Sequence, residues 1–197
     1  MKRFIFFVLF SVNLCVFAQL KPIYFIGNDV TSDSTIATSY GIYGKISGEE
    51  LYVLKTFDLA NNLVFTGSFK DADLKIPHGN FVYYHDVEDF NLLYKTNFFI
   101  EDKTRFIASK GSYVDGYQNG RWINFYPDGK IMTIITYVKG LKHGFSGSYD
   151  RRGKLVMSGL YNLDKKEGEW GNGKVKETYI DGILQLPSKD KPKNKAN

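Results

Sequence analysis

The chain has 197 residues, of which 43% are hydrophobic and 24% charged, a composition that suits one folded domain of ordinary size. Its net charge of +5 lies at the two ends: the start MKR carries +2 and the end KDKPKNKAN carries +3, so the middle sums to 5 − 2 − 3 = 0. A neutral middle argues against nucleic acid as a partner.

The first predicted element, residues 1–18, has the pattern of a secretory signal peptide: a basic start, an apolar run and the sequence VFA before the cleavage site. A single membrane anchor is the alternative, but the run contains Ser11 and Asn13 and is shorter than the roughly 20 apolar residues that a spanning helix needs. We expect cleavage after Ala18 and a periplasmic, outer-surface or secreted protein. Cleavage removes the only cysteine, Cys15, and leaves a mature chain without disulfides or thiol chemistry.

An internal repeat of 24 residues organises the rest of the chain. Three tyrosines and three glycines share this spacing: Tyr113, Tyr137 and Tyr161; Gly120, Gly144 and Gly168. Self-similarity at such a period indicates stacked structural units. The register extends back to Phe57–Phe69, which aligns with Tyr149–Tyr161, but the next comparable aromatic residue after Phe69 is 44 residues on. We expect an irregular insertion at about residues 85–110, and a shortened last unit that ends near Tyr179 and caps the array.

Each unit is predicted to contain two β-strands. The segments RWINFYP, IMTIITYVKG and LVMSGLYNLD are short, rich in aromatic and β-branched residues, and bounded by turn sequences. Asp128-Gly129 is a strong two-residue hairpin signal, because glycine accepts the positive φ that such turns require. No stretch sustains the 3.6-residue apolar period of a long helix. Residues 19–186 are therefore predicted to form an all-β, elongated antiparallel β-meander of hairpin repeats, in which the three tyrosines pack on one another.

The Lys-rich tail, residues 187–197, is polar and contains Pro187 and Pro192, so it is predicted to be disordered. Its lysines also suit electrostatic contact with an anionic surface, but charge runs of this kind are usually solvated.

The segments GSYVDGYQNGRWINFYPDGK and GLYNLDKKEGEWGNGK resemble MORN repeats, in the variant form found in many bacterial exported proteins. Both have a glycine and an aromatic residue, a short loop closed by glycine, then tryptophan and a glycine-containing turn. The resemblance is clearest over residues 111–182, and it departs where Ser146 stands in place of the Trp122 and Trp170 of the flanking units. It implies an elongated, often curved antiparallel sheet used for binding or scaffolding, and it carries no common catalytic residue.

The sequence offers little catalytic or metal-binding chemistry. His78 and His143 precede turn glycines, and no close His or Cys spacing supports a metal site. The acidic clusters within residues 71–73 and 86–89 are interpreted as solvated loop residues. There is no nucleophile elbow and no phosphate-binding loop before a helix. We predict a protein without enzymatic activity, cofactor or metal.

Aromatic residues, 16% of the chain, are the feature that points to a binding surface. Strand alternation places Trp122 and Tyr126 on one face and Phe125 on the other. A thin sheet has little interior and uses stacked rings as its core. We favour this interpretation for Tyr113, Tyr137 and Tyr161, which we call the tyrosine column. If the tryptophan face is open, Trp122, Tyr126 and Trp170 form an aromatic strip for a protein segment or a sugar ring, and Trp122→Ala costs less stability than Tyr137→Ala.

These observations favour an exported, non-enzymatic repeat scaffold that binds a protein through its sheet face or edge. The alternative is a surface protein that binds glycans or lipid head groups, although a neutral repeat region argues against strong binding to anionic lipid. Related bacterial repeats are sometimes described as antitoxins, but a signal peptide fits a cytoplasmic antitoxin badly.

The signal-peptide pattern predicts that the mature protein begins at Gln19 and is found outside the cytoplasm. Mass spectrometry of the native protein should identify this N-terminus. A protein with an intact Met1 in the soluble cytoplasmic fraction would contradict the prediction.

Overall fold

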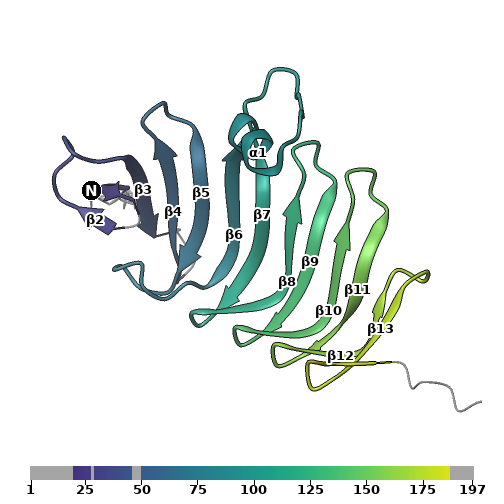
Figure 1. Ribbon diagram of the computed structural model, residues 1–197. Helices are drawn as coiled ribbons and strands as arrows, with labels where there is room; N and C mark the ends of the chain where they lie inside the picture. The colour runs from purple at the N-terminus through teal and green to yellow at the C-terminus, as the bar shows by residue number, and fades with distance from the viewer. Residues whose placement is uncertain (1–19, 28, 46–49, 187–197) are drawn as a thin grey trace, which may run out of the picture.

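In a computed structural model that describes residues 20–27, 29–45 and 50–186, the chain forms one antiparallel sheet and one short helix. Fourteen strands follow one another almost in chain order, and the two end strands of the described part do not meet, so the sheet is open and elongated (Figure 1). The predicted all-β antiparallel meander is confirmed. The expected signal peptide, 1–18, and the tail, 187–197, lie outside the described residues.

The sheet runs from β14 at one edge to β3, then β1 and β2 at the other. Its strands are β1 (Lys21–Ile26), β2 (Asp29–Thr31), β3 (Ser39–Lys45), β4 (Tyr52–Asp58), β5 (Leu63–Phe69), β6 (Gly79–Asp86), β7 (Arg105–Val114), β8 (Tyr117–Phe125), β9 (Ile131–Val138), β10 (Leu141–Tyr149), β11 (Leu155–Asn162), β12 (Lys165–Gly171), β13 (Lys176–Ile180) and β14 (Ile183–Gln185). The helix, α1 (Val87–Tyr94), lies between β6 and β7.

Two kinds of turn alternate along the regular units. Four connections, from β7–β8 to β13–β14, are two-residue turns in which both residues have positive φ, as type I′ turns require: Asp115-Gly116, Lys139-Gly140, Leu163-Asp164 and Asp181-Gly182. Asp128-Gly129, predicted to be a two-residue turn, belongs instead to the five-residue turn Tyr126–Lys130. There the Tyr126 amide donates to the Lys130 carbonyl at 2.8 Å. Pro127 at the second position of this turn and Gly129 at the fourth favour a type I turn. Hairpin loops of four or five residues are most often built around such a turn.

Two long connections interrupt the repeat. The β5–β6 connection, residues 70–78, replaces a two-residue turn, and the β6–β7 connection, residues 87–104, replaces a five-residue turn. Together they account for the 44-residue spacing found in the sequence. The region 85–110 is not irregular throughout, because its two ends belong to β6 and β7, which pair with each other. We call residues 87–104, which include α1, the insertion.

The core of this single-layer sheet consists of large rings that lie on glycines of the preceding strand. A Cβ added to Gly111 would lie 2.2 Å from Cδ2 of the Trp122 indole, so the ring occupies the space that any side chain there would need. We call such contacts glycine–ring pairs, and the sheet contains Gly67–Phe81, Gly111–Trp122 and Gly159–Trp170. Their rings are among the most buried side chains described, at 2%, 8% and 4% exposed, respectively.

The middle unit, β9 and β10, has no glycine–ring pair. At the corresponding positions the large residue is on the first strand and the small residue is on the second. Ile135 of β9 stands where the flanking units have glycine, and it pairs with Ser146 of β10, which stands where they have tryptophan. The absence of tryptophan in this unit is therefore matched by the absence of the glycine that would receive it.

The tyrosine column packs differently from the prediction. Each tyrosine pairs with a positive-φ glycine of the neighbouring strand: Gly79–Tyr113, Gly120–Tyr137, Gly144–Tyr161 and Gly168–Tyr179. Tyr113 and Tyr161 contact the tryptophans edge to face, with ring centroids 5.1 Å from Trp122 and 4.9 Å from Trp170. The tyrosines do not stack on one another because two strand spacings, about 10 Å, separate successive members of the column.

Glycine–ring pairs predict that their two positions are energetically coupled. Gly111→Ile should lower the free energy of unfolding by about 1–3 kcal/mol or more, because the new side chain overpacks the site. Trp122→Ser should lower it by about 3–5 kcal/mol, because a large buried ring is lost. The double variant copies the Ile135–Ser146 arrangement and should lose less than the sum of the single losses. Chemical denaturation of the four proteins measures the coupling.

The matched control combines Gly111→Ile with Trp170→Ser, two changes in different units. Their losses should add, because the two sites share no contact. Additive losses in the Gly111–Trp122 cycle as well would show that the two positions do not depend on each other.

Candidate functional site

The expected aromatic strip is not an open surface. Trp122 and Trp170 are buried because each indole lies on a glycine and is flanked by a tyrosine ring. Each indole Nε1 also donates to a backbone carbonyl, that of Ser112 at 3.2 Å and that of Leu160 at 3.0 Å, respectively. The open tryptophan face, on which the smaller stability loss expected for Trp122→Ala depended, is therefore absent at Trp122.

Tyr126 lies apart from the tryptophans, in an aromatic cluster against α1. Its hydroxyl donates to the Tyr149 carbonyl at 2.8 Å, and its ring stacks on Phe98 with centroids 5.9 Å apart. Phe90 of α1, 4% exposed, meets the Tyr126 ring at 81° and the Phe106 ring at 89°. The structure thus groups Tyr126 with the insertion, so the three predicted strip residues do not form one site.

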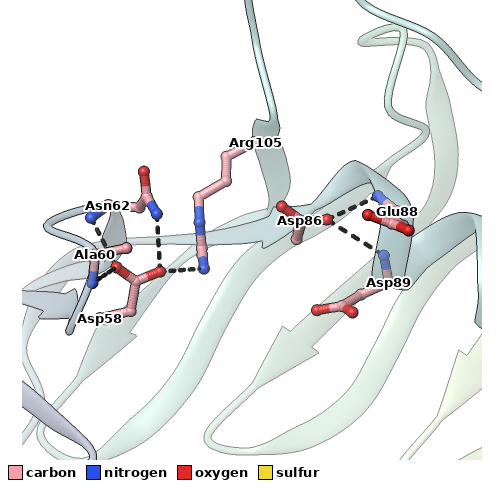
Figure 2. A network of polar contacts seen from close by, with 7 residues as sticks. All are labelled: Asp58, Ala60, Asn62, Asp86, Glu88, Asp89 and Arg105. Carbon is pink, nitrogen blue, oxygen red and sulfur yellow. Dashed lines mark hydrogen bonds and ion pairs between the residues drawn. The ribbon is translucent and has the colours of Figure 1, made fainter.

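The helix begins where the sequence supplies a cap. The side chain of Asp86 accepts hydrogen bonds from the amides of Glu88 at 2.8 Å and Asp89 at 3.3 Å (Figure 2). Acidic residues in the first turn also suit the positive end of the helix dipole. The helix ends at Lys95, which adopts the left-handed conformation that terminates many helices. Of the acidic cluster expected to be solvated loop residues, Asp86 is therefore a helix cap, whereas Glu88 and Asp89 lie in the first turn of α1 with their side chains exposed.

Asn91 holds the return segment of the insertion against α1. Its Nδ2 donates to the Phe98 carbonyl at 2.9 Å. Its Oδ1 accepts from the Phe98 amide at 2.8 Å and from the Thr96 hydroxyl at 2.7 Å. One side chain thus satisfies three polar groups of a segment that has no strand partner, and this fixes the shape of the loop after the helix.

An ion pair braces the base of the insertion. Arg105, the first residue of β7, donates through Nη2 to Oδ2 of Asp58, which ends β4 (Figure 2); the distance is 2.6 Å. Asp58 Oδ1 also accepts from the amides of Ala60 at 3.0 Å and Asn62 at 2.8 Å. Burial raises the pKa of Asp58, but the hydrogen bonds from Asn62 and the charge of Arg105 outweigh it, so this pKa lies below its ordinary value.

The outward side of the insertion carries four large apolar residues, which we call the insertion surface: Leu92, 73% exposed; Leu93, 71%; Tyr94, 51%; and Phe99, 88%. They face solvent because Val87 and Phe90 occupy the buried side of α1. The insertion contains four acidic and two basic residues, a net charge of 2 − 4 = −2. Exposed apolar patches with a polar rim are typical of interaction sites.

A cavity of about 450 Å³ lies between α1 and the sheet and extends the insertion surface. Leu93 and Tyr94 line it from the helix, and Trp122, Asn124 and Met132 line it from the strands. The insertion surface and this cavity together form a partly concave apolar site.

The insertion surface was not predicted from the sequence, although a signal was present. The apolar runs FNLLY and NFFI lie in the longer of the two connections that interrupt the repeat, which begins directly after the capping residue Asp86. A helix of eight residues is too short for periodicity to reveal it, and the capping pattern is the cue that remains.

No protein-family model matches the chain, and the curated proteins provide no match to it. In the part of the chain that the structure describes, no three potential metal-binding side chains come together. No helix among the described residues has the length and apolar character needed to cross a membrane. The insertion surface is therefore identified as the candidate site from its geometry.

The Asp58–Arg105 pair predicts a loss of stability in acid. Because folding lowers the pKa of Asp58, its stabilising contribution is fully present above the unfolded pKa of about 3.9 and is lost as pH falls through the lower folded pKa. Asp58→Asn removes the contribution, so the difference in unfolding free energy from wild type should shrink below about pH 4. Urea denaturation across this pH range measures it.

The control is Asp73→Asn, which changes an aspartate that is 72% exposed in the β5–β6 connection. It should alter stability little at any pH, since exposed ion pairs contribute little. A pH-independent difference for Asp58→Asn would show that the ionised carboxylate is not what stabilises the base of the insertion.

Proposed function

We propose that the chain is an exported, non-enzymatic scaffold of the MORN-repeat type that binds a protein partner in the cell envelope or outside the cell. The observation that carries this proposal is Phe99, which at 88% is the most exposed of the large apolar residues described. It belongs, with Leu92 and Leu93, to the longer of the two connections that interrupt the repeat. The regular units keep their largest rings against glycines, whereas the insertion displays its own to solvent.

The support beneath the insertion surface is rigid, which favours binding. Phe90 packs among four aromatic rings, Asn91 fixes the return segment, and Arg105 ties the base of the insertion to Asp58. A segment held in this way loses little backbone freedom on association, so more of the burial energy appears as affinity. An apolar surface without such support would be a weaker argument for a partner.

The charge around the insertion surface favours protein over lipid. A net charge of −2 repels an anionic membrane surface and complements a partner whose apolar groove has a basic rim. Hot spots of protein interfaces are typically large buried side chains surrounded by polar contacts. Phe99, Leu92 and Tyr94 suit the role of such anchors.

Capture of partners from an envelope extract tests the proposal, with wild type and Phe99→Ser compared by quantitative mass spectrometry. The change should reduce the captured partner by about tenfold or more, as expected when a central apolar anchor is lost. Leu59→Ser is the matched control, because Leu59 is 68% exposed in the β4–β5 turn, away from the insertion. It should leave capture unchanged.

Two outcomes would overturn the proposal. Equal capture by wild type and Phe99→Ser would remove the insertion surface as the docking site. Binding of wild type, but not of Phe99→Ser, to vesicles of phosphatidylglycerol and phosphatidylcholine would identify a lipid surface in place of a protein.

A further inference from the structure

A second cavity lies beside the β8–β9 turn, where β6, β7, the end of β8 and the end of the insertion line it. Its volume is about 630 Å³, within the range of small-ligand sites. Arg105 and Ile107 of β7 line it, and so does Phe106, which also packs against Phe90 of α1. None of the four residues of the insertion surface is among its lining residues.

The cavity has positive charge that the protein does not balance. Lys103 and Lys110 line it, and neither forms an ion pair within the described residues. Arg105 is paired with Asp58, yet its Nε is buried without a hydrogen-bond partner among the described residues. The only acid in the lining, Asp128, is already paired with the Lys130 ammonium at 2.5 Å.

Aromatic rings stand beside these cations. The Lys110 ammonium lies 5.3 Å from the centroid of the Phe125 ring, and Tyr84 lines the cavity from β6. An apolar ring face next to the Lys110 ammonium, with Lys103 in the same lining, suits a ligand that has both an apolar face and an anionic group.

We propose that this cavity binds an acidic sugar, that is, a carbohydrate ring that bears a carboxylate. The ring packs against Phe125 and Ile107, and its carboxylate accepts hydrogen bonds from Lys110 and Lys103. The Tyr84 hydroxyl and the rim carboxylate of Asp128 serve the sugar hydroxyls as donor and acceptor. This site goes beyond the proposed protein scaffold and does not depend on it.

Two features favour an acidic sugar over an acidic peptide. β7 and β8 are paired on both sides within the sheet, so no free strand edge is present beside the cavity for an extended peptide. Asp128 would repel a row of acidic side chains, but it can accept from neutral hydroxyls. The mixture of donors, one acceptor and apolar ring faces matches a polyol ring better than a run of carboxylates.

Isothermal titration of the mature protein with trigalacturonate at low salt tests the proposal. Lys110→Gln should weaken binding about tenfold, the loss typical of one hydrogen bond to a charged group. Phe125→Leu should also weaken it, because the flat ring face is lost. The matched control is Lys55→Gln, since Lys55 is an exposed lysine on the same sheet face, separated from Lys110 by Thr66 and Val82 in one cross-strand row.

The support expected is binding of trigalacturonate that Lys110→Gln weakens and Lys55→Gln does not, with no comparable binding of the neutral galactose trisaccharide. Equal weakening by the two lysine variants would indicate general charge attraction and overturn the proposal. Absence of binding would overturn it as well. Hexaglutamate bound as tightly as trigalacturonate, and weakened by Lys110→Gln, would assign the site to acidic peptides instead.

Discussion

The rest of the structure depends on one packing constraint: a sheet of one layer has no second layer against which to bury its large side chains. The protein meets this constraint within the layer at three places, by setting a large ring on a strand position that has no side chain. Phe81, Trp122 and Trp170 reach core-like burial in this way. The middle unit shows that the constraint acts on pairs, because Ile135 and Ser146 exchange the large and small positions together.

The sequence predicted the parts of the fold that depend on spacing along the chain. The 24-residue period, the glycine-containing turns and the aromatic-rich strands were sufficient to predict an antiparallel meander. The burial of Trp122 could not be predicted in the same way, because the glycine beneath it lies on another strand and is found only when the register is known. Alternation identified the face of the tryptophan but not what fills that face.

The insertion was predicted as an irregular segment, but its structure and its exposed surface were not. Its helix depends on one capping carboxylate, Asp86, and its orientation depends on Phe90 entering a cluster with Phe106 of β7 and Tyr126 of the β8–β9 turn. Because Phe90 points into this cluster, the side chains on the other side of α1 remain exposed. The Asp58–Arg105 pair likewise joins residues 47 positions apart, a relation that no local pattern shows.

The open meander also sets how far the insertion lies from the end of the sheet. Neighbouring strands are about 4.8 Å apart and rotate by about 20–25° relative to each other. A unit of two strands therefore moves everything beyond it by about 10 Å and turns it by about 40–50°. The distance and the direction from the insertion to the C-terminal strand β14 therefore depend on the number of units between them. Each unit adds the same step. Related chains with one unit more or fewer would present the same surface at a different reach and angle.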